Sequence, residues 1–352
     1  MPLHSTALYQ DAARSAQMAG LRYVSDEEPG IQRHRWGRGF TYIDSDGNRV
    51  QPGTQRSWLE SLAIPPNWED VWICPDPNGH LQATGRDARG RKQYRYHPDW
   101  INLRNQLKFD RLIPFAQKLP ALRKTTQQQL AIKPLTLDRN TVTAAIVQLL
   151  DHTLVRIGNS HYSQANGSYG LTTLRKRHVD VTANHLTFEF RGKSGVDQEI
   201  DLHNRRLANV VSRCQEIPGY ILFKYIDDDG SRQTIDSGDV NEYLQSAMGE
   251  SFTAKDFRTW GGTVVACKAL ASTTSENAVT GAIKAAARQL GNRSATCRKY
   301  YIHPAIIDAY ESGLLADCAL NWSPDTRPHL SHDEQRTLAV LNYCRNSSFM
   351  AA

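Results

Sequence analysis

The chain has 352 residues, among them 42 Lys and Arg against 36 Asp and Glu, which leaves a formal net charge of +6. This length exceeds the ~250–300 residues at which single hydrophobic cores stop growing, so we expect two domains, and the positive charge favours a polyanionic partner such as nucleic acid. The sequence has no run of 18 apolar residues, no apolar leader and no C-x-x-C pair among its six cysteines, which argues against a membrane protein and a secreted disulfide scaffold.

Residues 20–98 predict a small β-rich domain. Short apolar alternations such as residues 40–43 and 71–73 are typical of strands, and turn sequences such as DSDGN at residues 44–48 separate them. We therefore place an N-terminal domain at residues 1–98.

The periodicity becomes helical after residue 98. Apolar residues recur at three- and four-residue intervals from Val142 to Ile157, and the same pattern returns further along the chain. We expect a larger, mainly α domain at residues 99–320, and a linker with one helix at residues 321–352. The predicted fold class is α+β.

One β-hairpin interrupts the helical region. Residues 179–202 alternate between apolar and polar side chains on both sides of a Gly-Lys-Ser-Gly tip, with Leu186, Phe188 and Phe190 before it. The pattern places Lys193 on the turn of the hairpin.

Four polar residues occur at positions where the local sequence pattern by itself predicts only a structural role. They are Arg156 at the end of the long apolar helix, Lys193 on the hairpin tip, Arg258 and Tyr301. Arg258 follows the helix-start signal Thr253-x-x-Asp256 and lies on the flank of the apolar stripe of that helix. Tyr301 shortly precedes Pro304, which limits helix continuation.

Each of these residues also has an ordinary explanation. An Arg or Lys on a helix flank is usually a solvated charge, and a Tyr beside another Tyr, as Tyr301 is beside Tyr300, is more often a packed aromatic. Asn292 after Gly291 fits a helix C-cap. Taken singly, these residues do not establish a catalytic site.

Taken together, the motifs match a known family. Residues 65–75 (PPNWEDVWICP) and 85–97 (GRDARGRKQYRYH) closely resemble the N-terminal signature of poxvirus-like bacterial DNA topoisomerases of type IB. The later matching motifs, in chain order, are RIGNSHY at residues 156–162, YGLTTL at 169–174, FRGKSG at 190–195, KDFRTW at 255–260 and LGN at 290–292, followed by Tyr301. The resemblance implies a mainly α catalytic domain of the kind that tyrosine recombinases and these topoisomerases share, with a small β-hairpin sheet.

The resemblance also implies the active-site residues. Tyr301 is then the nucleophile, and Arg156, Lys193 and Arg258 are the catalytic cations. Asn292 stands where the poxviral and eukaryotic pattern has His, and bacterial members of the family often carry Asn there. An amide can donate a hydrogen bond to a phosphoryl oxygen but carries no positive charge, so we expect a weaker contribution than from His. The sequence is compatible with direct and with indirect contact of Asn292 with the scissile phosphate.

The implied activity is relaxation of supercoiled duplex DNA through a transient single-strand break, a 3′-phosphotyrosyl intermediate and religation, without ATP, a cofactor or an obligatory metal. Guanidiniums suit this reaction because they are always charged and present forked donors to phosphate oxygens. Lys193 either protonates the leaving 5′-hydroxyl or grips a phosphate or base, and the resemblance favours the acid role. The sequence has no P-loop motif and no metal-ligand spacing of carboxylates, Cys or His, which argues against ATP-driven and Mg²⁺-dependent topoisomerases.

Basic and aromatic residues interleave at residues 86–96, a composition suited to phosphates and base edges. By resemblance, Gln93, Tyr94 and Tyr96 contact double-stranded DNA, and a basic solvent-facing strand is the alternative. Further DNA-binding candidates are Arg86, Lys92, Asn159, Tyr162 and Lys255. We expect a monomer without membrane attachment that acts at the nucleoid in the cytoplasm, with two domains that close round the duplex as a clamp.

Two other functions fit parts of the pattern. A tyrosine recombinase shares the tyrosine and the Arg, Lys, Arg order, but it typically shows His-x-x-Arg where this chain has Lys255-x-x-Arg258. A non-catalytic DNA-binding protein of the same fold is disfavoured because all four core positions are present.

Overall fold

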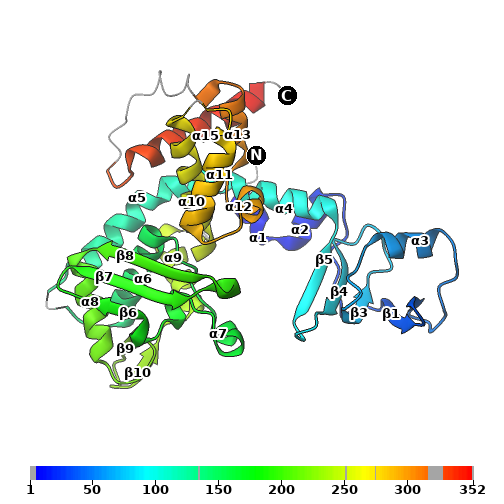
Figure 1. The fold of residues 1–352 in the computed structure, drawn as a ribbon, viewed down its shortest axis with the longest axis horizontal. Coiled ribbons are helices and arrows are strands. Elements are labelled where there is room, and N and C mark those ends of the chain that lie inside the picture. Colours follow the sequence, from blue (N-terminus) through cyan, green and yellow to red (C-terminus); the bar gives the residue numbers. More distant parts are fainter. Residues whose placement is uncertain (1–4, 134, 250–251, 274, 316–327, 351–352) are drawn as a thin grey trace. The chain divides into compact units, whose positions relative to one another are not determined.

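The structure is a computed structural model, and it describes residues 5–133, 135–249, 252–273, 275–315 and 328–350. The chain divides into two compact units, Met1–Arg111 and Leu112–Ala352, which are described separately (Figure 1). No helix within the described residues is long and apolar enough to span a bilayer.

The first unit contains a five-stranded antiparallel sheet with strand order β2-β1-β3-β4-β5, and residues 5–111 also form four helices. Its elements, in chain order, are α1 (Ser5–Gln10), α2 (Ala12–Met18), β1 (Ile31–Trp36), β2 (Gly39–Ile43), α3 (Thr54–Ser61), β3 (Glu69–Ile73), β4 (Leu81–Arg86), β5 (Lys92–Tyr96) and α4 (Pro98–Asp110). The strands predicted at residues 40–43 and 71–73 are confirmed as β2 and β3. The sequence did not predict α1, α2 or α3.

One face of this sheet forms a hydrophobic core with α3. Because successive side chains of a strand point to opposite faces, Ile31, Val71, Ile73 and Ala83 come together, and Leu59 of α3 packs on them. The opposite face carries Lys92, Tyr94 and Tyr96 of β5, three alternate residues that are exposed.

The first unit extends past the boundary expected near residue 98. Trp100 of α4 packs with Ala16 and Leu21 in a small core cluster. Arg104 of α4 lies 3.9 Å from the centre of the Tyr9 ring and donates a hydrogen bond to the Tyr9 carbonyl. These contacts hold α4 to the N-terminal helices, so the change to helical periodicity marks the start of α4 and not the end of the unit.

The second unit is mainly helical and carries a three-stranded antiparallel sheet, β6-β7-β8, and a two-stranded sheet, β9-β10. Its elements, in chain order, are α5 (Leu112–Gln129), α6 (Arg139–Thr153), α7 (Ser160–Asn166), the 3₁₀ helices η1 (Leu171–Thr173) and η2 (Lys176–His178), β6 (Val179–Val181), β7 (His185–Arg191), the 3₁₀ turn η3 (Lys193–Gly195), β8 (Asp197–His203), α8 (Arg205–Glu216), β9 (Lys224–Ile226), β10 (Arg232–Thr234), α9 (Ser237–Met248), α10 (Ala254–Ala271), α11 (Ala278–Leu290), α12 (Ser294–Tyr300), α13 (Pro304–Glu311) and α15 (His332–Met350). The C-terminal helix predicted from the sequence is α15, whereas the predicted linker falls largely outside the described residues.

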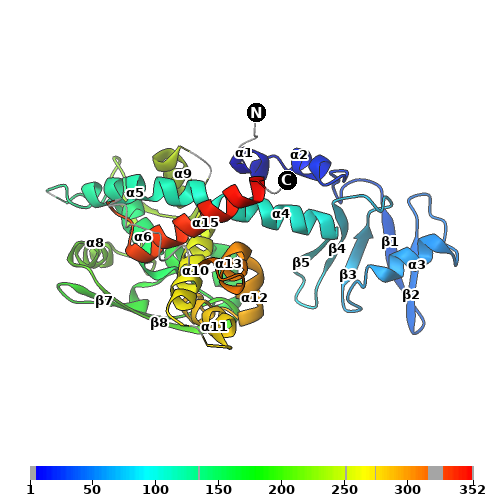
Figure 2. The same ribbon diagram turned by 90° about the horizontal axis from the view of Figure 1, so that it is seen from above.

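Helix α10 lies at the centre of the second unit and contacts α5, α6, α11, α13 and α15 (Figure 2). The predicted helix start is confirmed, because the Asp256 carboxylate accepts the Thr253 backbone N–H at 2.7 Å. Phe257 and Trp260 are buried as expected from the apolar stripe. Helix α10 therefore gives several neighbouring elements a common support.

The long helix α6 ends earlier than its apolar period suggested. Thr153 is its last residue, and Leu154 takes a left-handed backbone with φ of 56° while its N–H closes the last turn on Leu150. Arg156 is thus not a helical residue. It lies on the segment that follows, where its carbonyl accepts the N–H of Leu171 at 2.9 Å.

The predicted hairpin is confirmed. Strands β7 and β8 pair from His185 opposite His203 to Arg191 opposite Asp197, and η3 forms the tip with Lys193 exposed. The apolar residues of β7 are buried on the side of α8, so the alternation read from the sequence fixes the register.

Candidate active site

Tyr301 lies at the junction between α12 and α13. Its N–H closes the last turn of α12 on the Cys297 carbonyl at 2.9 Å, and Pro304 is the first residue of α13. The expectation that Pro304 stops helix continuation is confirmed. The side chain of Tyr301 is half-buried at this bend between two short helices.

Helix α10 approaches this junction closely at Gly262 and Thr263. A Cβ atom at position 262 would lie 2.7 Å from the Tyr301 carbonyl oxygen, so only a glycine fits without a shift. The hydroxyl of Thr263 donates to the Thr259 carbonyl at 2.8 Å and accepts the His303 N–H at 3.1 Å. The backbone on both sides of the Tyr301 side chain is therefore fixed to α10.

Arg258 is buried next to Tyr301 rather than solvated on the helix flank. Its terminal nitrogens donate to the carbonyls of Leu154, at the end of α6, and Leu290, at the end of α11, the latter at 2.8 Å. Its guanidinium carbon is 5.3 Å from the centre of the Tyr301 ring. Burial, followed by the positive charge of Arg156, lowers the pKa of Arg258 to about 10.

Arg156 and Asn292 form the other side of the site. A terminal nitrogen of Arg156 donates to the side-chain oxygen of Asn292, and burial lowers the pKa of Arg156. The Asn292 side-chain nitrogen is buried and finds no hydrogen-bond acceptor among the described residues. An unused buried donor of this kind is rare and suits a bound acceptor such as a phosphoryl oxygen.

The backbone of Asn292 also caps α11, as the ordinary explanation predicted. Gly291 takes a left-handed conformation with φ of 57°, and the Asn292 N–H donates to the Ala287 carbonyl at 2.9 Å. The cap uses only the backbone of Asn292, which leaves its side chain for Arg156.

Two glycines hold the Arg156 segment in place. Gly158 has φ of +101°, and a Cβ atom at Gly170 would lie 2.5 Å from the Arg156 carbonyl oxygen. Tyr169 in turn donates its N–H to the Arg191 carbonyl at 2.8 Å. The segment that carries Arg156 is thereby joined to the end of β7, two residues before Lys193.

The hairpin contacts the site through Gln198 of β8. A Cβ atom at Gly291 would meet the Gln198 amide nitrogen at 2.9 Å, and one at Gly192 would meet the Gln198 Cγ at 3.1 Å. Gln198 therefore lies between the hairpin tip and the turn that carries Asn292. The side chain of Lys193 forms no hydrogen bond or ion pair within the described part of the chain.

The structure thus brings Tyr301, Arg156, Arg258 and Asn292 together and leaves Lys193 exposed on the neighbouring hairpin tip. Neither guanidinium is paired with a carboxylate among the described residues. Two cations without a counter-ion next to a phenol suit a phosphodiester, because its oxygens can accept from both guanidiniums while the phenol oxygen attacks phosphorus.

Sequence reasoning missed the residues that support the site. Gly262 was detectable, because two consecutive glycines inside a helix are unfavourable unless something approaches closely. Gln198 and Thr263 have no comparable signal, since their partners are distant in the sequence.

Most of the predicted DNA-binding residues lie on the hairpin of β4 and β5, where several are paired with carboxylates. Lys92 pairs with Asp26 at 2.6 Å, and the Gln93 amide donates to Asp87 at 2.9 Å. Arg86 pairs more loosely with Asp70, at 3.7 Å. A hydrogen bond from Arg91, with further ones from nearby backbone, lowers the pKa of Asp87 to about 2.

The aromatic and remaining candidates are exposed. The rings of Tyr94 and Tyr96 stack at 5.9 Å between centres and are 49% and 36% exposed. Lys255 is exposed in the first turn of α10, and Asn159 is exposed just before α7. Tyr162 belongs to α7, but its side chain lies outside the described residues.

Comparisons with known proteins match both units to DNA topoisomerases. A family model described as "Eukaryotic DNA topoisomerase I, catalytic core" matches residues 97–312, and one described as "Bacterial DNA topoisomerase IB, N-terminal domain" matches residues 39–87. The chain is 32% identical over 297 residues to DNA topoisomerase 1B of Acanthamoeba polyphaga mimivirus, covering 80% of this chain and 88% of the relative. It is 28% identical over 150 residues to DNA topoisomerase 1B of vaccinia virus (strain Copenhagen) and to DNA topoisomerase I of monkeypox virus, covering 41% of this chain and 47% of each relative.

Proposed function

Because the chain belongs to the family of type IB DNA topoisomerases, we propose that Tyr301 forms the covalent bond to a backbone phosphate through which this family relaxes supercoiled duplex DNA. The observation that carries the assignment is the position of the Tyr301 ring, 5.3 Å from the guanidinium carbon of the buried Arg258. Tyr300 directly precedes it, and the Lys299 ammonium lies 5.4 Å from the centre of the Tyr300 ring.

The reaction needs two reversible transesterifications. The Tyr301 hydroxyl oxygen bonds to phosphorus and loses its proton, while the bond from phosphorus to the 5′-oxygen breaks and that oxygen gains a proton. Attack by the 5′-hydroxyl then reverses both changes. The tyrosyl ester conserves the energy of the phosphodiester bond, so no ATP is consumed.

Arg156 and Arg258 favour the ionised phenol and stabilise the negative charge of the transition state. Burial lowers the pKa of both guanidiniums, and the positive charge of Arg156 lowers that of Arg258 further. A phosphate bound between the two arginines would offset this repulsion. Arg258 still has its Nε–H free of any partner among the described residues, and Asn292 has its side-chain nitrogen. These two buried donors support a direct role at the phosphate.

Lys193 is the proposed general acid that protonates the leaving 5′-oxygen. Its exposure on the tip lets it reach a bound duplex, and the contact between Gln198 and Gly291 holds the hairpin beside the site. The alternative is that Lys193 only grips a phosphate or a base.

The N-terminal unit is proposed to clamp the duplex with the candidates around β5. Exposed, stacked Tyr94 and Tyr96 next to Lys92 support this role, since aromatic and basic side chains together suit base edges and phosphates. We further propose that the protein acts as a monomer, because residues 112–352 supply the nucleophile and every proposed cation of one complete site. The proposed location is the nucleoid, since duplex DNA is the substrate of the family.

A relaxation assay in EDTA without nucleotide tests this function. The wild type and Tyr300→Phe should relax both positive and negative supercoils and form a covalent DNA adduct, whereas Tyr301→Phe should do neither. An inert wild type would overturn the function, and an adduct that maps to Tyr300 would overturn the assignment of the nucleophile.

A further inference from the structure

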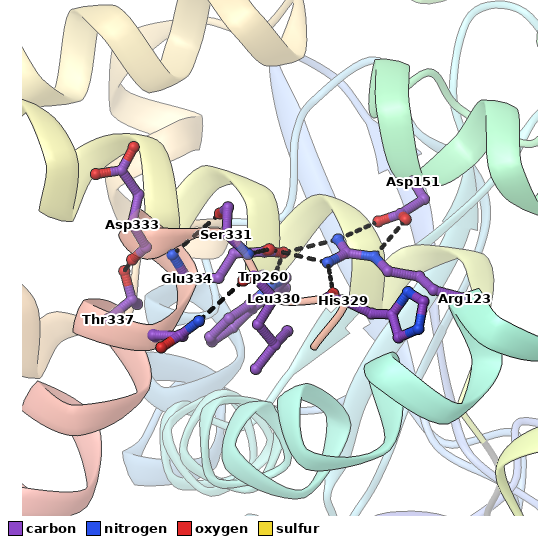
Figure 3. Close-up of polar contacts among 10 residues, drawn as sticks. Arg123, Asp151, Trp260, His329, Leu330, Ser331, Asp333, Glu334 and Thr337 are labelled. Atoms are coloured by element: carbon purple, nitrogen blue, oxygen red, sulfur yellow. Dashed lines mark hydrogen bonds and ion pairs between the residues drawn. The ribbon is translucent and has the colours of Figure 1, made fainter. Parts of the chain in front are cut away.

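The C-terminal helix α15 is joined to the rest of the second unit by a buried ionic cluster. Arg123 of α5 donates to the Asp151 carboxylate of α6 and to the Glu334 carboxylate of α15, each at 2.7 Å (Figure 3). The three side chains are only 20%, 12% and 10% exposed. Arg123 thus connects three helices in a region where water screens charges weakly.

Glu334 is the member that connects the cluster to α10. Besides Arg123, it accepts the indole N–H of Trp260 in α10 at 3.1 Å and the backbone N–H of Ser331 at 2.8 Å (Figure 3). Burial would raise the pKa of Glu334, but these hydrogen bonds and the charge of Arg123 hold it below its ordinary value. Glu334 is therefore ionised at neutral pH.

The cluster is connected to both partners of the hydrogen bond from Arg258 in α10 to the Leu154 carbonyl at the end of α6. Trp260 follows Arg258 by two residues on α10. On the other side, Asp151 lies in the last turn of α6, three residues before Leu154, whose carbonyl accepts from Arg258. A shift of α10 relative to the end of α6 would therefore move the guanidinium away from its carbonyl partner.

Helix α10 packs closely on the end of α6 beside this cluster, because a Cβ atom at Gly261 would lie 2.3 Å from the Leu154 Cδ1. A pocket of about 470 Å³ is lined by Leu154, Trp260 and Gly261 as well as by the ionic cluster. The ionic cluster therefore borders the same contact between α6 and α10 that Leu154 makes with Gly261.

We propose that Glu334 is a positioning residue for the cleavage reaction, holding α10 against the end of α6 so that Arg258 faces Tyr301. The proposal rests on the proposed function of Arg258 and Tyr301. The catalytic-core family model ends at residue 312, so Glu334 and α15 lie beyond the matched core.

The chain offers a matched control on the same pair of helices. Asp333, the neighbour of Glu334, pairs with Lys268 of α10 at 2.9 Å, and the Lys268 side chain is 64% exposed. This ion pair also joins α15 to α10, but it involves neither Trp260 nor Arg123. Asp333→Asn therefore tests helix docking in general without changing the buried cluster.

The test is single-turnover cleavage of a duplex at saturating protein, with duplex affinity and thermal unfolding measured alongside. Glu334→Ala and Trp260→Phe should each lower the cleavage rate constant by about 10- to 100-fold, since small misplacements of catalytic groups have effects of this order. Duplex affinity should stay unchanged, Glu334→Gln should be intermediate, and Asp333→Asn should match the wild type. A purely structural role would lower the amplitude of cleavage, through loss of folded protein, and leave the rate constant of the folded fraction unchanged.

A second substrate, with sulfur in place of the 5′-bridging oxygen, distinguishes a defect in the action of Arg258 from a defect in general-acid catalysis by Lys193. A thiolate leaves without protonation because thiols are more acidic than alcohols. Lys193→Ala should recover most of its rate on this substrate, whereas Glu334→Ala and Arg258→Ala should both stay slow. Recovery of Glu334→Ala would overturn the proposal, because Glu334 would then act through the general acid.

The remaining outcomes are equally decisive. Wild-type rate constants for folded Glu334→Ala and Trp260→Phe, or an equal loss in Asp333→Asn, would overturn the proposal. If Glu334→Ala does not fold, Trp260→Phe and Glu334→Gln decide the same question. A wild type that forms no adduct at Tyr301 would instead overturn the proposed function.

Discussion

Gly262 lies so close to Tyr301 that a Cβ atom at position 262 would be 2.7 Å from the Tyr301 carbonyl oxygen. Gly262→Ala should therefore push α10 away from the nucleophile and lower both the cleavage rate and the free energy of unfolding. Gly281 in α11 is the control, because a Cβ atom there meets nothing within 4 Å. Gly281→Ala should leave cleavage unchanged and stabilise the protein by about 1 kcal/mol, the usual gain for this change inside a helix. Equal effects of the two substitutions on cleavage would contradict the close contact.

Asn292 caps α11 through its backbone, and its side chain is proposed to act at the phosphate. Asn292→Ala should slow single-turnover cleavage by about 100-fold, the usual order for loss of one transition-state donor. Asn292→Asp should be slower still, because a carboxylate beside Arg156 neutralises the cation that the phosphate needs. Both variants should keep the thermal stability of the wild type within a few degrees, since the cap of α11 uses the backbone N–H. A large fall in stability would mean that the side chain mainly serves the fold.

If Lys92 binds phosphate as proposed, Asp26 competes with DNA for it. The two side chains form an ion pair at 2.6 Å, and the Thr84 hydroxyl also donates to Asp26, at 2.9 Å. Asp26→Asn should release Lys92, raise duplex affinity several-fold at low salt, and steepen the dependence of log affinity on log salt by about one, the value for one more phosphate contact. The control is Asp76→Asn, which removes the same charge from a pair with Arg22. Identical affinity and salt slopes in the two variants would show that Lys92 does not bind phosphate.

We expect His303 to make the stability of the second unit dependent on pH. Its ring nitrogen accepts the N–H of Ala305 at the start of α13, and burial lowers the pKa of His303 from 6.5 to about 4. Between these two values the unfolded chain binds a proton that the folded protein does not, so the contribution is complete above pH 6.5 and is lost as pH falls towards 4. The full loss is about 3 kcal/mol.

Urea denaturation from pH 4 to 7, followed by circular dichroism, measures this loss. His303→Asn keeps a good helix cap without a titrating group and should flatten the profile. His332→Asn, at the exposed start of α15, should retain the wild-type slope. A profile for His303→Asn as steep as that of the wild type would assign the dependence to other groups.

Local patterns predicted the elements of the site better than its contacts. The alternation and the Gly-rich tip placed Lys193 on the hairpin, the Thr-x-x-Asp signal placed the start of α10, and Pro304 marked the bend after Tyr301. These features depend on neighbours within a few residues, and local sequence records them.

Features set by distant partners could not be read in the same way. The apolar period continued past Leu154, yet α6 ends there with a carbonyl that accepts from Arg258, 104 residues further along the chain. The burial of Arg258 likewise follows from two carbonyls at the ends of α6 and α11. The partners Arg123 and Glu334 are separated by 211 residues, so no local pattern announces their contact.

The cap of α11 has a consequence for how the protein can change. Because the Asn292 N–H and the left-handed Gly291 complete the cap, most side chains at position 292 are compatible with the same fold. On the proposed role of Asn292, exchanging this amide for an imidazole in a single substitution should alter the rate of strand cleavage and leave the architecture intact. Natural variants of this enzyme could therefore differ in turnover through position 292 while keeping the stability that the cap of α11 provides.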